Sequence, residues 1–181
     1  MNPLCRCRIC CLLALVVTLL LTGCSIKTDG LVPDHPVAVT TRIDSSVEVM
    51  PVQGGRASSF GREAYITNAQ YRDALYRALS DARLFREVTL DGPADWQLHS
   101  EIITISTEGG VSPLYAIVVQ YWIVDPASGT EIWRKGINTR HQVKWNEAFA
   151  GATRIIRAVE GATKKNLTGL IEALSREAPG L

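Results

Sequence analysis

Four of the five cysteines lie close together near the N-terminus, at Cys5, Cys7, Cys10 and Cys11. Clustered thiolates are the ligands of zinc and iron-sulfur sites, but such sites usually join two CxxC-type halves across a loop. Here basic residues interrupt the cluster, and no second half follows it downstream. The spacing therefore argues against a metal site, and the neighbouring residues must explain the cluster.

The residues around the cluster are typical of a secretory signal peptide. Arg6 and Arg8 give a basic start, and an apolar run follows from Cys11 to Thr22. That run is about a dozen residues long, whereas a helix needs about 20 to span the hydrocarbon core of a bilayer. A basic start and a short apolar run together indicate an export signal that is removed. We therefore expect residues 1–23 to be cleaved, and the four clustered cysteines to be lost with them.

The end of the apolar run resembles the lipobox of bacterial lipoproteins, in the order Leu21, Thr22, Gly23 and Cys24. The resemblance implies that the signal peptidase cuts between Gly23 and Cys24, because the small glycine leaves the bond accessible. It also implies that the thiol of Cys24 carries a diacylglycerol. Several acyl chains anchor a protein firmly, whereas a single chain holds it only marginally. We expect the mature chain to be anchored to a membrane through Cys24, its only cysteine, and to contain no disulfide.

The residue after the lipobox bears on which membrane holds the anchor. An aspartate at this position usually retains bacterial lipoproteins in the inner membrane, but this chain has Ser25 there. The resemblance therefore implies the periplasmic face of the outer membrane rather than the inner membrane.

No other set of side chains has the spacing of a catalytic or metal site. His99 and Glu101 alternate onto one face of an expected strand, and His141 lies on a later strand. A metal site needs three or four convergent ligands, and only two can be placed. No serine lies in a GxSxG turn, and no glycines form a nucleotide-binding motif. We expect no catalytic residue, no metal and no cofactor.

The charge of the mature chain gives no sign of nucleic-acid binding. Without Arg6 and Arg8 the 19 Lys and Arg residues become 17, against 18 acidic residues. Both signs are scattered along the chain, so there is no basic stripe of the kind that nucleic acids require. The length of 181 residues suits a single domain. We expect a lipidated polar tether at 24–36 and one periplasmic α/β domain at 37–181.

Apolar periodicity predicts the first elements of that domain. β-branched residues favour strands within 37–52, and a Gly- and Ser-rich loop follows at 53–63. Residues 67–70 have the pattern of a capping box at the start of a helix, and residues 83–90 lead from that helix into a strand. The expected apolar stripe of the helix consists of Tyr71, Leu75, Ala78, Ala82 and Phe85.

Further strands and a second helix complete the pattern. Strands are expected at 96–105 and 114–125, and a turn then returns the chain along another strand. The amphipathic helix that follows contains Gly161 and Gly169, which each cost it about 1 kcal/mol relative to alanine, so one of them indicates a close contact or a bend. The resulting order is β-α-β-β-β-α, an α+β fold with a mainly antiparallel sheet and two helices on one face.

The expected hairpin places two tryptophans side by side. A turn closed over 125–130 puts Ile123 opposite Ile132. The same register puts Trp122 opposite Trp133, and such a pair stabilises a sheet by roughly 0.2–1 kcal/mol. The alternative is a partner surface, since exposed tryptophans among polar residues are typical of protein interfaces. The candidate partner surface consists of Trp122, Trp133, Gln120 and Lys135.

Basic residues on the last helix also have two interpretations. They are Arg154, Arg157, Lys164 and Lys165. One interpretation is an ordinary solvated helix face, and the other is contact with anionic lipid or glycan.

Three stretches and the final helix together resemble a family of envelope lipoproteins. The stretches are ALSDARLFREV, ADWQLHSEI and VDPASGTEIW. They resemble the periplasmic α/β domain of the lipoproteins of curli secretion and Pel polysaccharide export, and of related envelope lipoproteins, over roughly Ala38 to Leu174. The resemblance implies a lipid-anchored and often oligomeric part of an envelope assembly, with no catalytic residues.

Two related considerations limit what this resemblance implies. The chain lacks the extra length that curli pore lipoproteins use for membrane-spanning hairpins, so we do not expect it to form a pore alone. Lipoproteins auxiliary to lipid or lipopolysaccharide transport have a similar plan, so binding of a lipid or glycan is a second hypothesis, and an unrecognised hydrolase is a third. The sequence favours a non-enzymatic structural or accessory role, with an envelope protein or a second copy as partner.

Overall fold

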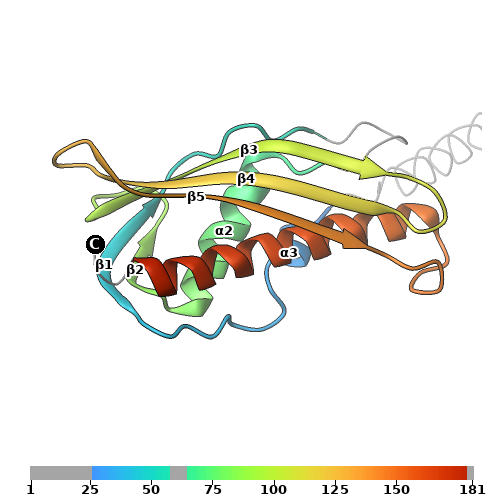
Figure 1. The fold of residues 1–181 in the computed structure, drawn as a ribbon, viewed down its shortest axis with the longest axis horizontal. Helices are drawn as coiled ribbons and strands as arrows, with labels where there is room; N and C mark the ends of the chain where they lie inside the picture. Colours follow the sequence, from blue (N-terminus) through green and yellow to red (C-terminus); the bar gives the residue numbers. More distant parts are fainter. Residues whose placement is uncertain (1–25, 58–64, 179–181) are drawn as a thin grey trace, which may run out of the picture.

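The computed structural model describes residues 26–57 and 65–178. Its elements, in chain order, are η1 (Thr28–Leu31), β1 (Ile43–Val49), α2 (Asn68–Ala82), β2 (Phe85–Thr89), β3 (Trp96–Glu108), β4 (Leu114–Asp125), β5 (Thr130–Gln142) and α3 (Gly151–Glu177). Figure 1 shows one sheet with α2 and α3 packed on the same side of it. The predicted signal peptide and Cys24 lie outside the described residues.

The sheet has the strand order β2-β1-β3-β4-β5 and is mixed. β1 is parallel to both β2 and β3, whereas β3, β4 and β5 form an antiparallel meander. The parallel pair β1 and β2 is joined by α2, because parallel neighbours need a crossover and a helix usually supplies it. The α+β class with two helices is confirmed. The predicted antiparallel pairing is confirmed for β3, β4 and β5, but the sheet is mixed because β1 pairs in parallel with β2 and β3. Four strands rather than three follow α2 because residues 85–89 form a separate edge strand.

The start and end of α2 follow from its sequence. The Thr67 side chain accepts a hydrogen bond from the backbone N–H of Gln70 at 3.2 Å, and the Thr67 N–H donates to the Gln70 side chain at 3.0 Å, which confirms the capping box. The helix ends at Ala82 because Arg83 takes the left-handed conformation, with φ of 51°. Phe85, predicted on the helix stripe, therefore begins β2. The predicted stripe residues buried on α2 are Tyr71, Leu75, Ala78 and Ala82.

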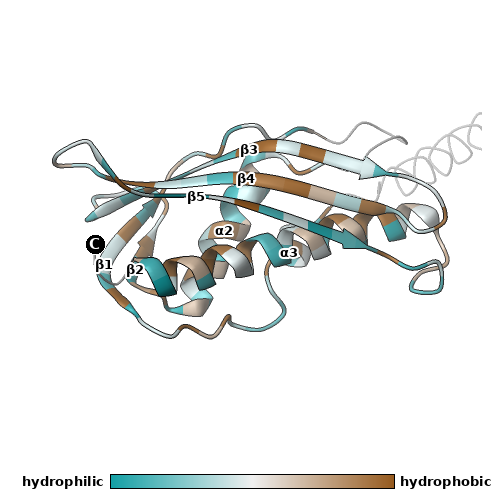
Figure 2. Cartoon of the chain, in the orientation of Figure 1, coloured by the Kyte–Doolittle hydropathy of each residue, from teal (hydrophilic) through white to brown (hydrophobic). Residues whose placement is uncertain are grey.

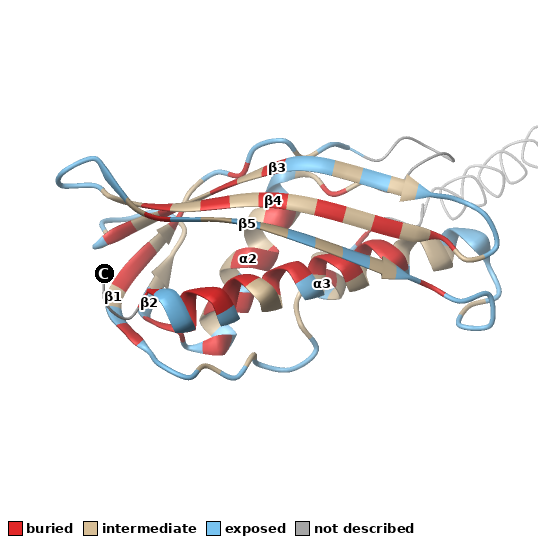
Figure 3. Cartoon of the chain, in the orientation of Figure 1, coloured by how far each residue is buried: buried red, intermediate tan, exposed pale blue. Residues whose placement is uncertain are grey.

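The core lies between the helices and the inner face of β4. Figure 3 shows buried residues alternating with half-buried ones along this strand. The alternation matches the period of a strand, so every second side chain points toward the helices. The fully buried residues of β4 are those that the sequence predicts on one apolar face: Tyr115, Ile117, Val119, Tyr121 and Ile123.

A buried polar cluster joins both helices to the sheet. The hydroxyl of Tyr121 on β4 donates to Oδ1 of Asn166 on α3 at 2.7 Å, and it also contacts the hydroxyl of Tyr71 on α2. The Asn166 amide donates to the backbone carbonyl of Ile137 on β5 at 3.0 Å. Burial raises the pKa of both tyrosines well above its ordinary value, so they stay neutral. The Tyr71 hydroxyl also donates to Oδ1 of Asn166 at 3.1 Å, so Asn166 has partners on α2, β4 and β5.

The β4–β5 hairpin differs from its predicted register by one residue. The turn closes with Asp125 opposite Thr130, as predicted, but a β-bulge follows it. As a result Ile123 pairs with Trp133 rather than with Ile132. A one-residue bulge moves the following side chains to the opposite face. The predicted pairing of Trp122 with Trp133 is wrong, because Trp122 pairs with Arg134.

One of the two helix glycines marks a close contact, as the sequence suggested. A Cβ atom added to Gly161 of α3 would lie 2.1 Å from Cδ2 of His141 on β5. The side chain of His141 thus packs on the helix backbone, where a larger residue than glycine has no room. Gly169 is less crowded, because a Cβ atom added there would lie 3.4 Å from its nearest neighbour, Cγ2 of Ile137.

Substitution of two tyrosines on the same face of β4 tests whether the buried polar cluster stabilises the fold. Tyr121→Phe removes the hydroxyl that bonds to Asn166 and should lower the free energy of unfolding by about 1 kcal/mol. Tyr115→Phe is the matched control, because the Tyr115 hydroxyl is buried with no protein partner among the described residues. It should leave stability unchanged or raise it. Urea unfolding of both variants gives the comparison, and equal losses would show that Asn166 is not a specific link.

Candidate functional site

The candidate partner surface predicted from the sequence is divided between two faces of the sheet. Trp122 and Gln120 lie on the face opposite the helices, which we call the open face. Trp133 points to the helix side and is only 8% exposed. Its indole N–H donates to Glu177 of α3 at 3.2 Å, and the Lys135 ammonium pairs with the same carboxylate. The bulge in the hairpin causes this division, so the structure does not bring the four predicted residues together.

Trp122 is the centre of a row of three side chains on the open face. His99 of β3 lies opposite it and stacks on it, with ring centroids 5.2 Å apart and planes within 8° of parallel. Arg134 of β5 lies opposite it on the other side, with its guanidinium carbon 5.1 Å from the ring centroid. Such a cation over an indole ring is an attractive contact. The row therefore holds the Trp122 ring from the strands on both sides.

The charges near this row are partly compensated. Nε of Arg134 donates to the Glu131 carboxylate at 2.7 Å. This bond lowers the pKa of Glu131 and raises the pKa of Arg134. Burial lowers the pKa of His99, so its ring is neutral near pH 7. The row thus combines one fixed cation with two neutral aromatic rings, a composition suited to protein contact.

The residues considered for a metal site remain apart. His99 and Glu101 alternate along the outward side of β3, but His141 packs on Gly161 on the helix side of the sheet. Within residues 26–57 and 65–178, no group of three or more His, Cys, Asp or Glu side chains is placed to hold a metal ion.

The segment predicted as a tether packs in part against the domain. Ile26 and Leu31 are buried, at 6% and 0% exposure. The Gln70 side chain at the start of α2 donates to the Ile26 carbonyl at 2.7 Å. Gly30 sits against Glu160 of α3, where an added Cβ would lie 2.2 Å from the carboxylate oxygen. The chain is therefore fixed to both helices from its first described residue onward.

Ion pairs on the surface of this segment support its position. Asp29 pairs with Arg77 of α2 at 2.5 Å, and Asp34 pairs with Lys164 of α3 at 2.5 Å. The bond to Lys164 lowers the pKa of Asp34, and burial raises the pKa of the neighbouring Glu160. Exposed pairs of this kind contribute little stability individually, so the buried side chains of Ile26 and Leu31 carry most of the attachment.

Surface hollows bear on the hypothesis of a lipid or glycan carrier. One hollow of ≈ 490 Å³ lies beside η1 and α2, and another of ≈ 530 Å³ lies beside β2 and the end of α2. A lipid site needs mainly apolar walls. Charged side chains are prominent in the walls of both hollows: Asp29, Asp34, Arg77 and Asp81 in the first, and Arg42, Asp44, Arg83, Arg86 and Glu87 in the second. The second hollow also has the apolar wall residues Ile43, Leu79, Phe85 and Val88.

Three features of these surfaces were missed by the sequence interpretation. The stack of His99 on Trp122 depends on strand register, which the sequence does not fix. Ile26 and Leu31 were visible as isolated apolar residues in a polar segment, a weak signal of packing. Trp145 and Phe149 lie in a segment without apolar periodicity, and both are exposed.

No helix among the described residues is both long enough and apolar enough to cross a membrane. Figure 2 shows hydrophilic residues interspersed along the whole of α3, the longest helix in the described part of the chain. This pattern belongs to a helix that packs one side on a sheet.

Comparison with known proteins identifies the fold. No family model matches the sequence, and no curated protein is significantly similar to it. Protein XCC0632 from Xanthomonas campestris, of the DUF330 family, has a TM-score of 0.64 and 12% identity over 82% of this chain and 96% of its own. A protein from Caulobacter crescentus described as a candidate lipoprotein has a TM-score of 0.50 and 13% identity, over 75% of this chain and 92% of its own.

A PelC dodecamer from Paraburkholderia phytofirmans also matches, with a TM-score of 0.43 and 11% identity over 75% of this chain and 93% of its own. The sequence-based resemblance to a group of envelope lipoproteins with this domain is thus confirmed for the fold. The descriptions of the Xanthomonas campestris and Caulobacter crescentus proteins name no enzymatic activity.

The location of the two tryptophans on opposite faces can be tested by comparing the free energies of unfolding of two variants. Trp133→Ala removes a nearly buried side chain and should cost about 3–5 kcal/mol of unfolding free energy. Trp122→Ala removes a half-buried side chain on the open face and should cost about 1 kcal/mol, the value of an aromatic contact. Urea unfolding measures both, and equal losses would contradict the bulged register.

Proposed function

We propose that the protein is a lipid-anchored, non-enzymatic domain of the bacterial cell envelope that acts as a structural or accessory part of an envelope assembly or export system. The observation that carries this proposal is the short distance in sequence between the lipobox and the core. Ile26 is buried and bonded to α2, and it lies two positions after Cys24. Residues packed on the domain are thus present within two positions of the point where the lipobox predicts that the mature chain begins.

The polar clusters in the described domain have structural explanations. Asn166 links α3 to β4 and β5, Glu177 holds the inner side of β5, and Glu131 holds Arg134. The proposal therefore assigns them no catalytic role. Because Ser25 follows the lipidated position, the proposed location is the periplasmic face of the outer membrane.

The open face around Trp122 is the proposed contact surface for a partner, either another envelope protein or a second copy. It combines the Trp122 ring with Gln120 on the same strand and Arg134 on the next. Tryptophan and arginine are the residues most enriched at the centres of protein interfaces. The carrier hypothesis is second, since the charged walls of the two hollows do not favour a lipid.

Loss of the anchor tests the first part of this proposal. The protein with Cys24→Ser, exported behind an ordinary cleavable leader, should keep its thermal unfolding temperature but leave the membrane fraction, because its acyl chains are absent. Fractionation after a salt wash measures the release, and mass spectrometry of the wild type should show acyl chains on Cys24. A Ser25→Asp variant is the control, since it keeps the lipid and should move to the inner membrane. A Cys24→Ser protein that stays fully with membranes would contradict the anchor.

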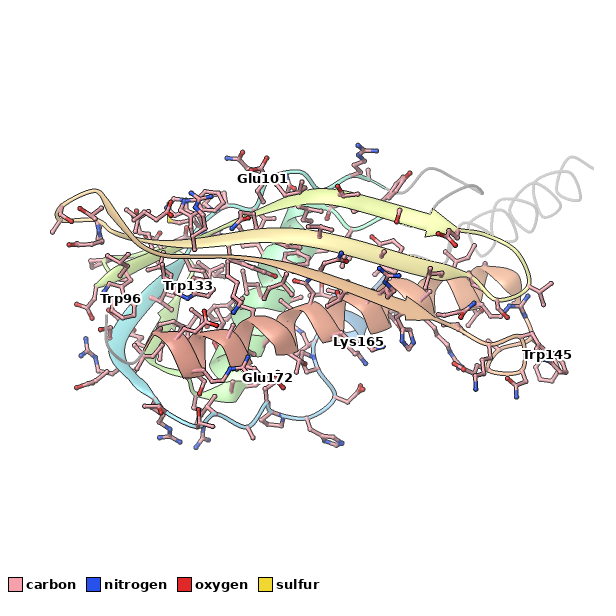
Figure 4. The ribbon with its side chains drawn as sticks, in the orientation of Figure 1. Trp96, Glu101, Trp133, Trp145, Lys165 and Glu172 are labelled. Carbon is pink, nitrogen blue, oxygen red and sulfur yellow. The ribbon has the colours of Figure 1, made fainter. Side chains whose placement is uncertain are left out.

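Site-specific cross-linking in cells tests the second part. A photoreactive residue at Gln120 lies on the open face, whereas one at Glu172 lies on the outer side of α3, as Figure 4 shows. Gln120 should give a discrete cross-linked species, and Glu172 should give none. Self-adducts would identify a second copy, and another dominant product would identify an envelope partner. Equal products from both positions, or none from Gln120, would contradict the proposed surface.

A further inference from the structure

Large exposed apolar side chains gather at one end of the molecule. Val111 lies in the β3–β4 loop, and Trp145 and Phe149 lie in the β5–α3 loop, with exposures of 69%, 68% and 107%. The Val143 N–H donates to the Pro113 carbonyl at 3.0 Å, so the two loops are neighbours. Figure 1 shows both loops at the end opposite the C-terminus, and Figure 4 shows Trp145 projecting there. We call Val111, Trp145 and Phe149 the apolar tip.

The β5–α3 loop, which contributes Trp145 and Phe149 to the apolar tip, is fixed by basic residues of α3. Arg154 donates from Nη1 to the carbonyls of Ala148 and Phe149, at 2.6 and 3.1 Å. Arg157 donates to the carbonyl of Glu147. These bonds fix the backbone of the loop while Phe149 stays fully exposed. The loop shape is thus determined by the helix, and the aromatic side chain is not folded back onto the domain.

Cations surround the apolar tip more than anions do. Lys144, Arg154 and Arg157 lie in or beside the β5–α3 loop, whereas the acidic residues near the tip are Glu147 of that loop and Glu108 at the end of β3. Aromatic side chains flanked by Lys and Arg are characteristic of segments that enter the interface of an anionic bilayer.

We propose that the apolar tip contacts the lipid bilayer, with Trp145, Phe149 and Val111 entering the boundary between headgroups and acyl chains. This inference rests on the proposed anchor at Cys24. Two residues of extended chain from Ile26 to Cys24 span at most about 7 Å, so the lipid holds the domain close to the membrane.

The N-terminal segment is attached to the half of α3 that lies nearer the apolar tip. Gly30 packs against Glu160, which is nine residues into the helix from Gly151 and therefore about 14 Å along its axis. Phe149 directly precedes that end of the helix. A bilayer that receives the acyl chains is thus within reach of the apolar tip.

The shape of the apolar tip favours lipid over a protein partner. Trp145 projects from the β5–α3 loop in Figure 4, and Phe149 of the same loop is fully exposed, so a protein partner would need a matching pocket for each of them. A bilayer adapts to such projections, and tryptophan prefers its headgroup region. A second contact also fixes the tilt of the domain, which a single lipid anchor leaves free.

Fluorescence quenching by brominated lipids tests this inference in the full lipidated protein. Vesicles of phosphatidylethanolamine and phosphatidylglycerol are prepared with ordinary or bromine-labelled acyl chains. Trp96 and Trp133 are shielded, at 9% and 8% exposure, so they should contribute little quenching. Bromine-dependent quenching should be clear in the wild type, disappear for the most part in Trp145→Phe, and persist in the control Trp122→Phe. Phe149→Ser together with Val111→Ser should weaken the quenching of Trp145 without changing the unfolding temperature.

The outcomes separate the tip from the anchor. Acyl chains on Cys24 with no bromine-dependent quenching of Trp145 would overturn the membrane contact and leave the anchor intact. If the wild-type protein isolated from cells carries no acyl chains and still shows bromine-dependent quenching of Trp145, the anchor is overturned and the contact is supported. A blue shift of Trp145 emission on self-association without vesicles, and no quenching with them, would assign the tip to a protein interface and overturn the proposal.

Discussion

The hydrogen bonds of Asn166 are the constraint on which the arrangement of the domain depends. A buried amide costs free energy unless its donors and acceptor are satisfied, and here they are bonded to Tyr121 and to the Ile137 carbonyl. Sliding or rotating α3 relative to the sheet would break both bonds at once. The apolar contacts of α3 stabilise its packing without specifying one position, whereas a satisfied polar group in a core specifies it. The place of Glu160 beside Gly30, and of Arg154 beside the β5–α3 loop, follows from that position.

The bulge after Ile123 is the second determinant, because it decides what each face of the sheet presents. Without it Trp133 would lie outside and Ile132 inside. With it the indole of Trp133 reaches Glu177 on α3, and Arg134 comes opposite Trp122. One inserted residue therefore moves a tryptophan into the core and an arginine onto the open face. Bulges with such effects are features that re-aim side chains rather than defects.

The parts of this structure that the sequence predicted are those determined by local interactions. The capping box at Thr67 and the strict alternation along β4 are set by residues within one element, and both were correct. The parallel pairing of β1 joins segments far apart in the chain, and short strands carry no signal of direction. The bulge was missed because Ile132 and Trp133 are both apolar, so either one suits the inner face. The packing of Ile26 and Leu31 depends on grooves between the helices that only the folded chain provides.

The burial of Ile26 has a consequence for how this domain would meet other molecules. A long flexible link lets an anchored domain sample a deep volume above the membrane, which dilutes it for any partner. Under the proposed anchor at Cys24, a link of two residues would confine the domain to a thin layer at the membrane surface. Partners held in the same layer then meet it by diffusion in two dimensions, at an effective concentration far above that in the bulk compartment. Weak contacts through a surface as small as the row around Trp122 can be sufficient for assembly under that confinement.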